Sequence, residues 1–73
     1  MINYYKLKVS YYRIDTDSKS FTQVNDAPDA SSIGVCTNEK IFEGLSGLIS
    51  DEWLVISEEQ FIFAKEEILN KLK

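Results

Sequence analysis

The segment that most constrains the fold is residues 4–14, in which apolar and polar side chains alternate. On an extended chain the two kinds fall on opposite sides, with Tyr5, Leu7, Val9 and Tyr11 against Lys6, Lys8 and Ser10. Alternation with a period of two is typical of a half-buried β-strand, and aromatic and β-branched side chains suit its pleated surface. We therefore predict one continuous strand over 4–14.

A polar turn and a second β-prone segment follow. Residues 15–19 read Asp-Thr-Asp-Ser-Lys, and aspartates in such turns accept hydrogen bonds from nearby backbone N–H groups. Residues 21–24 then return as the partner strand, which predicts an antiparallel hairpin over 4–24. Asp15 and Asp17 have the spacing of the first two ligands of a calcium loop, but Lys19 stands where the third ligand belongs. We predict an ordinary polar turn and no metal site.

The middle of the chain contains loop-forming and apolar segments. Residues 25–32 hold the only proline among Asn, Asp and Ser residues, which predicts a surface loop. Residues 33–36 read Ile-Gly-Val-Cys and are consistent with a short third strand. Residues 53–56 read Trp-Leu-Val-Ile, a continuous apolar and β-prone run that is typical of a central strand.

A middle helix is predicted over 39–49. Asn38 is a good N-cap, and apolar side chains follow at the spacing of one helix face: Ile41, Phe42, Leu45, Leu48 and Ile49. Gly44 and Gly47 each cost about 1 kcal/mol relative to alanine inside a helix. Whether the helix continues through these glycines or is broken there stays open at this point.

The C-terminal helix over 58–72 has the clearest start signal. Ser57 and Gln60 match the capping box, in which the serine side chain and the side chain three residues later satisfy each other's backbone N–H groups. Glu58 and Glu59 suit the positive end of a helix dipole. The core-facing stripe predicted for this helix is Phe61, Ala64, Ile68 and Leu72.

These elements predict a small α+β fold. A chain of 73 residues is the size of a single domain, so we assign 1–73 to one unit. We expect two layers: an antiparallel sheet, built from the N-terminal hairpin and one or two further strands, covered by the C-terminal helix and a shorter middle helix. The hydrophobic content of 44% is ordinary for a globular chain.

Composition excludes several kinds of chemistry. The chain has no histidine, the commonest general base and metal ligand, so a Ser-His-Asp or Cys-His arrangement cannot form within one chain. Cys36 is the only cysteine, which rules out an internal disulfide. No apolar run approaches the roughly 20 residues of a membrane span, and residues 1–6 lack the layout of a secretion signal. We expect no enzymatic activity, no cofactor, no membrane association and a cytoplasmic location.

The first strand offers a nucleic-acid face as one functional alternative. Aromatic side chains interleaved with cations on a sheet can stack bases and neutralise phosphates. The residues concerned are Tyr4, Lys6, Lys8 and Tyr12, with Arg13 nearby. The formal net charge of −4 disfavours nucleic acid as a partner, and a solvated sheet face is the simpler interpretation of the same residues.

Phe63 indicates a different function. On a helix it lies opposite the predicted core stripe, beside the polar residues Glu66, Glu67 and Asn70. A large aromatic side chain on a polar helix face is typical of a contact with a partner or a second copy, unless another segment of the same chain covers it. Our leading hypothesis is a small non-enzymatic protein-interaction module, able to self-associate as a homodimer.

The origin of the chain bears on the remaining alternative. Residues with AT-rich codons far outnumber those with GC-rich codons, which indicates an AT-rich genome, that of a low-GC bacterium or one of its phages. A phage virion or assembly component is therefore the third hypothesis.

Overall fold

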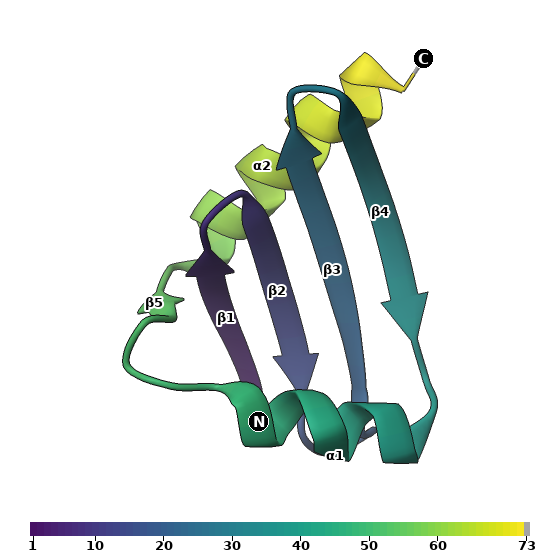
Figure 1. Cartoon of the computed structure of the whole chain (residues 1–73), viewed down its shortest axis with the longest axis vertical. Helices are drawn as coiled ribbons and strands as arrows, with labels where there is room; N and C mark the ends of the chain where they lie inside the picture. Colours follow the sequence, from purple (N-terminus) through teal and green to yellow (C-terminus); the bar gives the residue numbers. More distant parts are fainter. Residues whose placement is uncertain (73) are drawn as a thin grey trace.

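The computed structural model describes residues 1–72 and contains a five-stranded antiparallel sheet with two helices (Figure 1). In chain order the elements are β1 (Ile2–Leu7), β2 (Ser10–Asp15), β3 (Ser20–Ala27), β4 (Ala30–Cys36), α1 (Glu39–Leu48), β5 (Leu54–Val55) and α2 (Glu58–Lys71). The strand order across the sheet is β4-β3-β2-β1-β5. The predicted α+β class is confirmed, with an N-terminal meander and a C-terminal helix that is the longer of the two.

The predicted continuous strand over 4–14 is wrong, because the chain turns back at Lys8 and Val9. Leu7 pairs with Ser10 across this two-residue turn, so residues 2–15 form two strands in place of one. Lys8 has a φ of 56°, in the left-handed region that favours glycine. Neither residue is typical of a tight turn, which is why the alternating pattern gave no sign of it.

The predicted loop over 25–32 is also wrong, apart from its centre. β3 continues to Ala27, which pairs with Ala30 at the start of β4, and only Pro28 and Asp29 form the turn. The predicted strand over 33–36 therefore lies within β4, which is three residues longer at its N-terminal end. Asn, Asp and Ser residues are depleted in strands, and here pairing with β3 overrides that preference.

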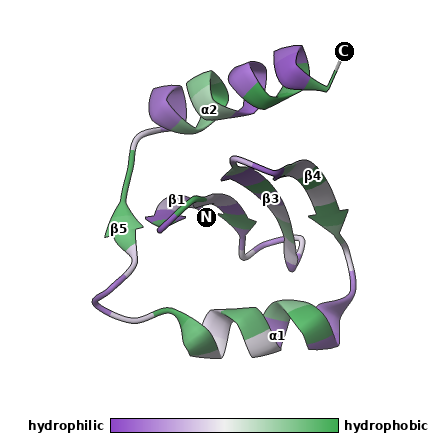
Figure 2. Ribbon diagram, turned by 45° about the horizontal axis from the view of Figure 1, so that its top comes forward, coloured by the Kyte–Doolittle hydropathy of each residue, from purple (hydrophilic) through white to green (hydrophobic). Residues whose placement is uncertain are grey.

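The two helices lie on opposite faces of the sheet, as Figure 2 shows. The fold therefore has three layers, with the sheet in the middle, where two layers were expected. α1 runs without a break through Gly44 and Gly47 and is capped by the Asn38 side chain, which accepts from the backbone N–H groups of Lys40 and Ile41. α2 has the predicted capping box between Ser57 and Gln60.

The core on the α1 side is built around Trp53. Its ring centroid lies 4.7 Å from that of Tyr12 and 6.1 Å from that of Tyr5. Phe42 of α1 and Ile14 of β2 complete the buried cluster, and half-buried apolar side chains surround it: Tyr5, Leu7, Phe21, Leu45 and Ile49. This core ties the loop between α1 and β5 to the first two strands.

The core on the α2 side contains Val24, Phe61 and Ile68, of which Val24 and Ile68 are completely buried. Half-buried Tyr4, Tyr11, Ile33 and Ile56 pack around it. Of the predicted α2 stripe, Phe61, Ala64 and Ile68 are buried as expected. Leu72, predicted as part of the stripe, is 56% exposed.

Residues 53–56 do not form a central strand as predicted. Only Leu54 and Val55 pair, with β1, and β5 is a short strand at one edge of the sheet. The apolar run has two other roles: Trp53 enters the α1-side core, and Ile56 packs on the α2 side. The two outer residues of the run thus pack in the two cores, while Leu54 and Val55 between them are 60% and 81% exposed.

The left-handed conformation of Lys8 predicts a stabilising substitution. Lys8→Gly should raise the free energy of unfolding by roughly 0.5–1 kcal/mol, because relief of the left-handed backbone outweighs the greater freedom of glycine in the unfolded chain. Urea denaturation followed by Trp53 fluorescence measures the change. The control is Val9→Gly at the adjacent position, which should lower stability. A gain for Val9→Gly but not for Lys8→Gly would contradict the assigned turn.

Candidate interaction surfaces

The structure separates the residues predicted as a nucleic-acid face. Tyr12 is only 8% exposed and packs on Trp53 in the α1-side core. Tyr4 lies on the opposite face of the sheet, with its ring centroid 5.5 Å from that of Phe61. The turn at Lys8 is the reason, since it reverses which residues of the second strand face each helix. The predicted face therefore forms only in part, without Tyr12.

The cations of that set also lie in different settings. The ammonium group of Lys6 lies 5.4 Å from the centroid of the Tyr11 ring, a distance at which a cation and an aromatic face attract each other. Lys8 is exposed in the turn, while Arg13 is half-buried in β2, paired with Tyr4 of β1. Lys6 and Arg13 therefore lie on the same face of the sheet as Tyr4, while Lys8 lies in the turn.

The residues predicted beside Phe63, by contrast, do share an exposed side of α2 with it. Phe63 is 65% exposed on α2, and Glu66, Glu67 and Asn70 are exposed on the same helix. Spacings of three, four and seven residues place all of them along one side of a helix, away from the buried stripe. No other segment of residues 1–72 covers Phe63, so the aromatic side chain faces solvent.

Phe63 borders a groove between α2 and the β1–β2 end of the sheet. The groove has a volume of ≈ 390 Å³. Its apolar lining comes from Tyr11, Ile56, Phe63 and Ala64, and its polar lining from Lys6, Ser57, Glu59, Gln60 and Glu67. We call it the Phe63 groove. Sequence reasoning identified Phe63 and Glu67, but the contribution of Lys6, Tyr11 and Ile56 depends on how the sheet folds under the helix.

The charge beside this groove is mainly negative. Glu59 and Glu67 line it, and the cation of Lys6 is held over the Tyr11 ring. Further along α2, Lys71 donates to Asp26 at 2.7 Å, and this hydrogen bond raises the pKa of Lys71 above its usual value. Lys71 is thus directed toward β3, and the two glutamates remain the exposed charges of the groove.

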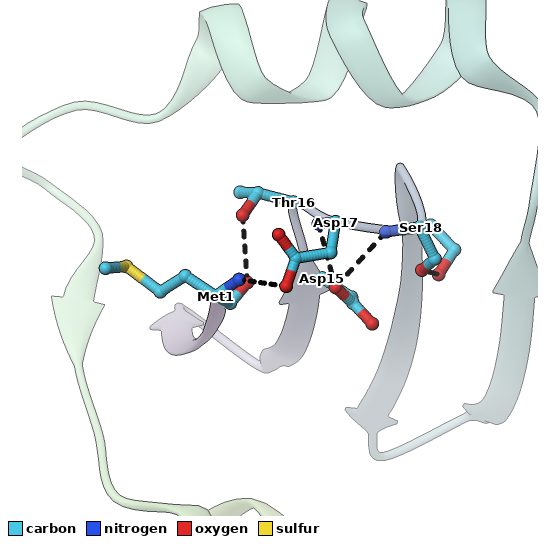
Figure 3. A network of polar contacts seen from close by, with 6 residues as sticks. Met1, Asp15, Thr16, Asp17 and Ser18 are labelled. Carbon is cyan, nitrogen blue, oxygen red and sulfur yellow. Dashed lines mark hydrogen bonds and ion pairs between the residues drawn. The ribbon is translucent and has the colours of Figure 1, made fainter.

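The Asp15–Lys19 turn forms a polar network of its own (Figure 3). The Asp15 carboxylate accepts from the backbone N–H groups of Asp17 and Ser18, at 2.9 and 3.3 Å. Burial alone would raise the pKa of Asp15, but these hydrogen bonds lower it below its usual value. The Asp17 carboxylate pairs with the amino group of Met1 at 2.7 Å. The observed geometry is that of a hydrogen-bonded turn.

A second open surface surrounds β4, and sequence reasoning missed it. A hollow of ≈ 370 Å³ lies over β3 and β4 where α1 leaves the sheet uncovered. It is lined by Phe21, Gln23, Asn25, Ser32, Ile33, Gly34, Val35, Cys36 and Ile41. β4 is also the outermost strand on its side of the sheet. Because we predicted a loop over 25–32, the N-terminal part of this strand was not predicted.

Other kinds of site are not seen in the described part of the chain. Within residues 1–72, no three or more Asp, Glu or Cys side chains come together in a way that could hold a metal ion. No helix there has the length and apolar character needed to cross a membrane. The comparisons with protein-family models, curated proteins and solved structures found no match.

The exposure of Phe63 can be tested by comparing it with Phe61, a buried phenylalanine on the same helix. Phe63→Ala should change the free energy of unfolding by no more than about 0.5 kcal/mol, because the side chain makes few internal contacts. Phe61→Ala should cost about 3–5 kcal/mol, close to the whole stability of so small a domain. Urea denaturation distinguishes the two. Equal losses for both variants would show that Phe63 belongs to the core.

Proposed function

We propose that this chain is a small non-enzymatic protein-interaction module whose binding surface is the Phe63 groove. The supporting observation is Phe63 itself, 65% exposed at the border of a groove that contains further apolar side chains. Aromatic anchors beside concave, partly apolar surfaces are the usual centres of binding energy in protein interfaces. An exposed Phe63 adds nothing to the core and lowers solubility, so a binding role accounts for it best.

The charge of the groove indicates the chemistry of the partner. Glu59 and Glu67 flank the apolar lining, and the whole chain carries a formal charge of −4. A complementary segment has an apolar side chain that packs between Phe63 and Tyr11, flanked by lysine or arginine. Nucleic acid requires positive charge on its binding surface, and here its phosphates would face these carboxylates. The partner we propose is therefore a basic protein segment with an apolar anchor.

The lone thiol agrees with the proposed cytoplasmic location. Cys36 is half-buried in β4 and has no second cysteine in the chain to pair with. A reducing compartment keeps such a thiol free, whereas an oxidising one would favour disulfides between molecules.

A matched pair of synthetic peptides tests the proposal. One peptide carries a tryptophan and leucine anchor flanked by lysines, and the other has the same anchor flanked by glutamates. In ¹H–¹⁵N NMR spectra, the lysine-flanked peptide should shift the amide signals of groove residues such as Tyr11, Gln60 and Glu67, and more weakly at high salt. The glutamate-flanked peptide should leave them unchanged.

Two variants of α2 provide the control. Phe63→Ser should weaken binding of the lysine-flanked peptide about tenfold or more, as expected for loss of an aromatic anchor. Ile62→Ser removes an exposed apolar side chain from the same helix, outside the groove lining, and should have little effect. Equal binding of the two peptides, shifts confined to another surface, or equal effects of the two variants would contradict the proposal. A single-stranded oligonucleotide that binds in their place would instead support the nucleic-acid alternative.

A further inference from the structure

The longer edge of the sheet is open. β4 pairs with β3 over seven residues and, within residues 1–72, has no partner on its other side (Figure 1). α1 and α2 lie over the two faces of the sheet and do not close this edge (Figure 2). The opposite edge is formed by β5, which is two residues long. An unpaired strand of the length of β4 is a template for another strand.

β4 also lacks the features that normally block pairing at an edge. Its sequence, Ala-Ser-Ser-Ile-Gly-Val-Cys, has no charged residue and no proline. Its register with β3 runs residue by residue from Cys36 to Ala30 without a bulge. Charged side chains, proline and bulges are the common means by which proteins keep strand edges apart. Their absence here leaves the edge competent to pair.

One hydrogen bond shows which backbone groups of β4 are free. The N–H of Asp26 donates to the carbonyl of Val9 at 2.8 Å, so Asp26 directs its backbone groups toward β2 and away from β4. Ser31, opposite Asp26, therefore exchanges no hydrogen bonds with β3. Because the pattern alternates along an antiparallel strand, the residues whose backbone groups point outward are Ser31, Ile33 and Val35.

This spacing is self-complementary. If two copies of β4 pair antiparallel about a two-fold axis at Ile33, Ile33 faces Ile33 and Ser31 faces Val35 of the other copy. All three outward-pointing residues then form hydrogen-bonded pairs, two bonds to each pair. The intervening pairs are Ala30 with Cys36 and Ser32 with Gly34, so no like charges oppose each other. The full length of the strand is used.

We propose that this protein forms a homodimer through antiparallel pairing of β4 with β4 of a second copy, centred on Ile33. The two sheets join into one, and each subunit keeps its own Phe63 groove. The occupant of the edge is a second copy because the uncharged sequence and the outward-pointing groups match themselves in this register. Val35, 70% exposed in one copy, lies beside Ser31 of the partner strand on the same face of the joined sheet.

The first test compares a charge placed on each edge of the sheet. Light scattering after size exclusion, from micromolar to millimolar protein, should show the wild type passing from monomer to dimer. Val35→Lys should raise the dissociation constant about tenfold or more, because a lysine on an edge strand opposes pairing with a second strand. Val55→Lys, at the 81% exposed position on β5, should leave it unchanged. Phe63→Ser should also leave it unchanged, which separates dimerisation from the groove.

The second test fixes the register. Ala30→Cys places a thiol opposite Cys36 of the other copy in a pair with a Cα separation of about 4.5 Å, within the range of disulfides. Mild oxidation should link this variant into a covalent dimer. The wild type should not link, since its two Cys36 residues would lie roughly 20 Å apart along the strands. Adding Cys36→Ser to the Ala30→Cys variant should remove the Ala30–Cys36 link.

Three results would overturn the proposal. The first is a wild type that stays monomeric at millimolar concentration, which would leave the edge to a strand of another protein. The second is equal dimerisation of the Val35→Lys variant and the wild type. The third is an Ala30→Cys variant whose cross-linking does not depend on Cys36, because the register centred on Ile33 requires that pair.

Discussion

The two-residue turn at Lys8 and Val9 is the constraint on which the rest of the structure depends. Because Tyr5 pairs with Tyr12 across it, these two rings share a face and meet Trp53, while Tyr4 and Tyr11 face α2. Each Tyr-Tyr pair thus supplies one ring to each core. A straight strand over the same residues would place Tyr5 and Tyr11 on one face and leave the helices without matched surfaces.

An element of the fold or of the groove could be predicted from the sequence where the residues that specify it are close together in the chain. The capping box at Ser57 and Gln60 and the cap at Asn38 lie next to the helices that they start, and both helices were predicted within a residue of their observed bounds. The turn at Lys8 carries no glycine, asparagine or aspartate, and its position is set by the pairing of β1 with β2. Missing that turn also gave the wrong face for Tyr12. Phe63 was identified because helix periodicity is a local property, while the rest of its groove comes from the sheet.

Covering both faces of a small sheet determines where contacts with other molecules can form. The two cores use the aromatic residues of the strands, and the apolar side chains left most exposed on the sheet, Val35, Leu54 and Val55, lie on its two edge strands. Two surfaces are of interest among those left exposed: the outer side of α2, where Phe63 lies among glutamates, and the free edge of β4. These two surfaces differ in chemistry: the groove selects a partner by an apolar anchor and charge, and the edge by backbone hydrogen bonds. One module can therefore use both surfaces at once.

Amide hydrogen exchange of β4, followed by NMR in dilute and in concentrated protein, tests most directly the central claim that a regularly paired strand leaves one edge free. In dilute solution the amides of Ser32, Gly34 and Cys36 should be protected by β3, while those of Ser31, Ile33 and Val35 exchange freely. In concentrated solution the second set should become protected as well. Uniform protection along β4 at every concentration, or none, would contradict the account.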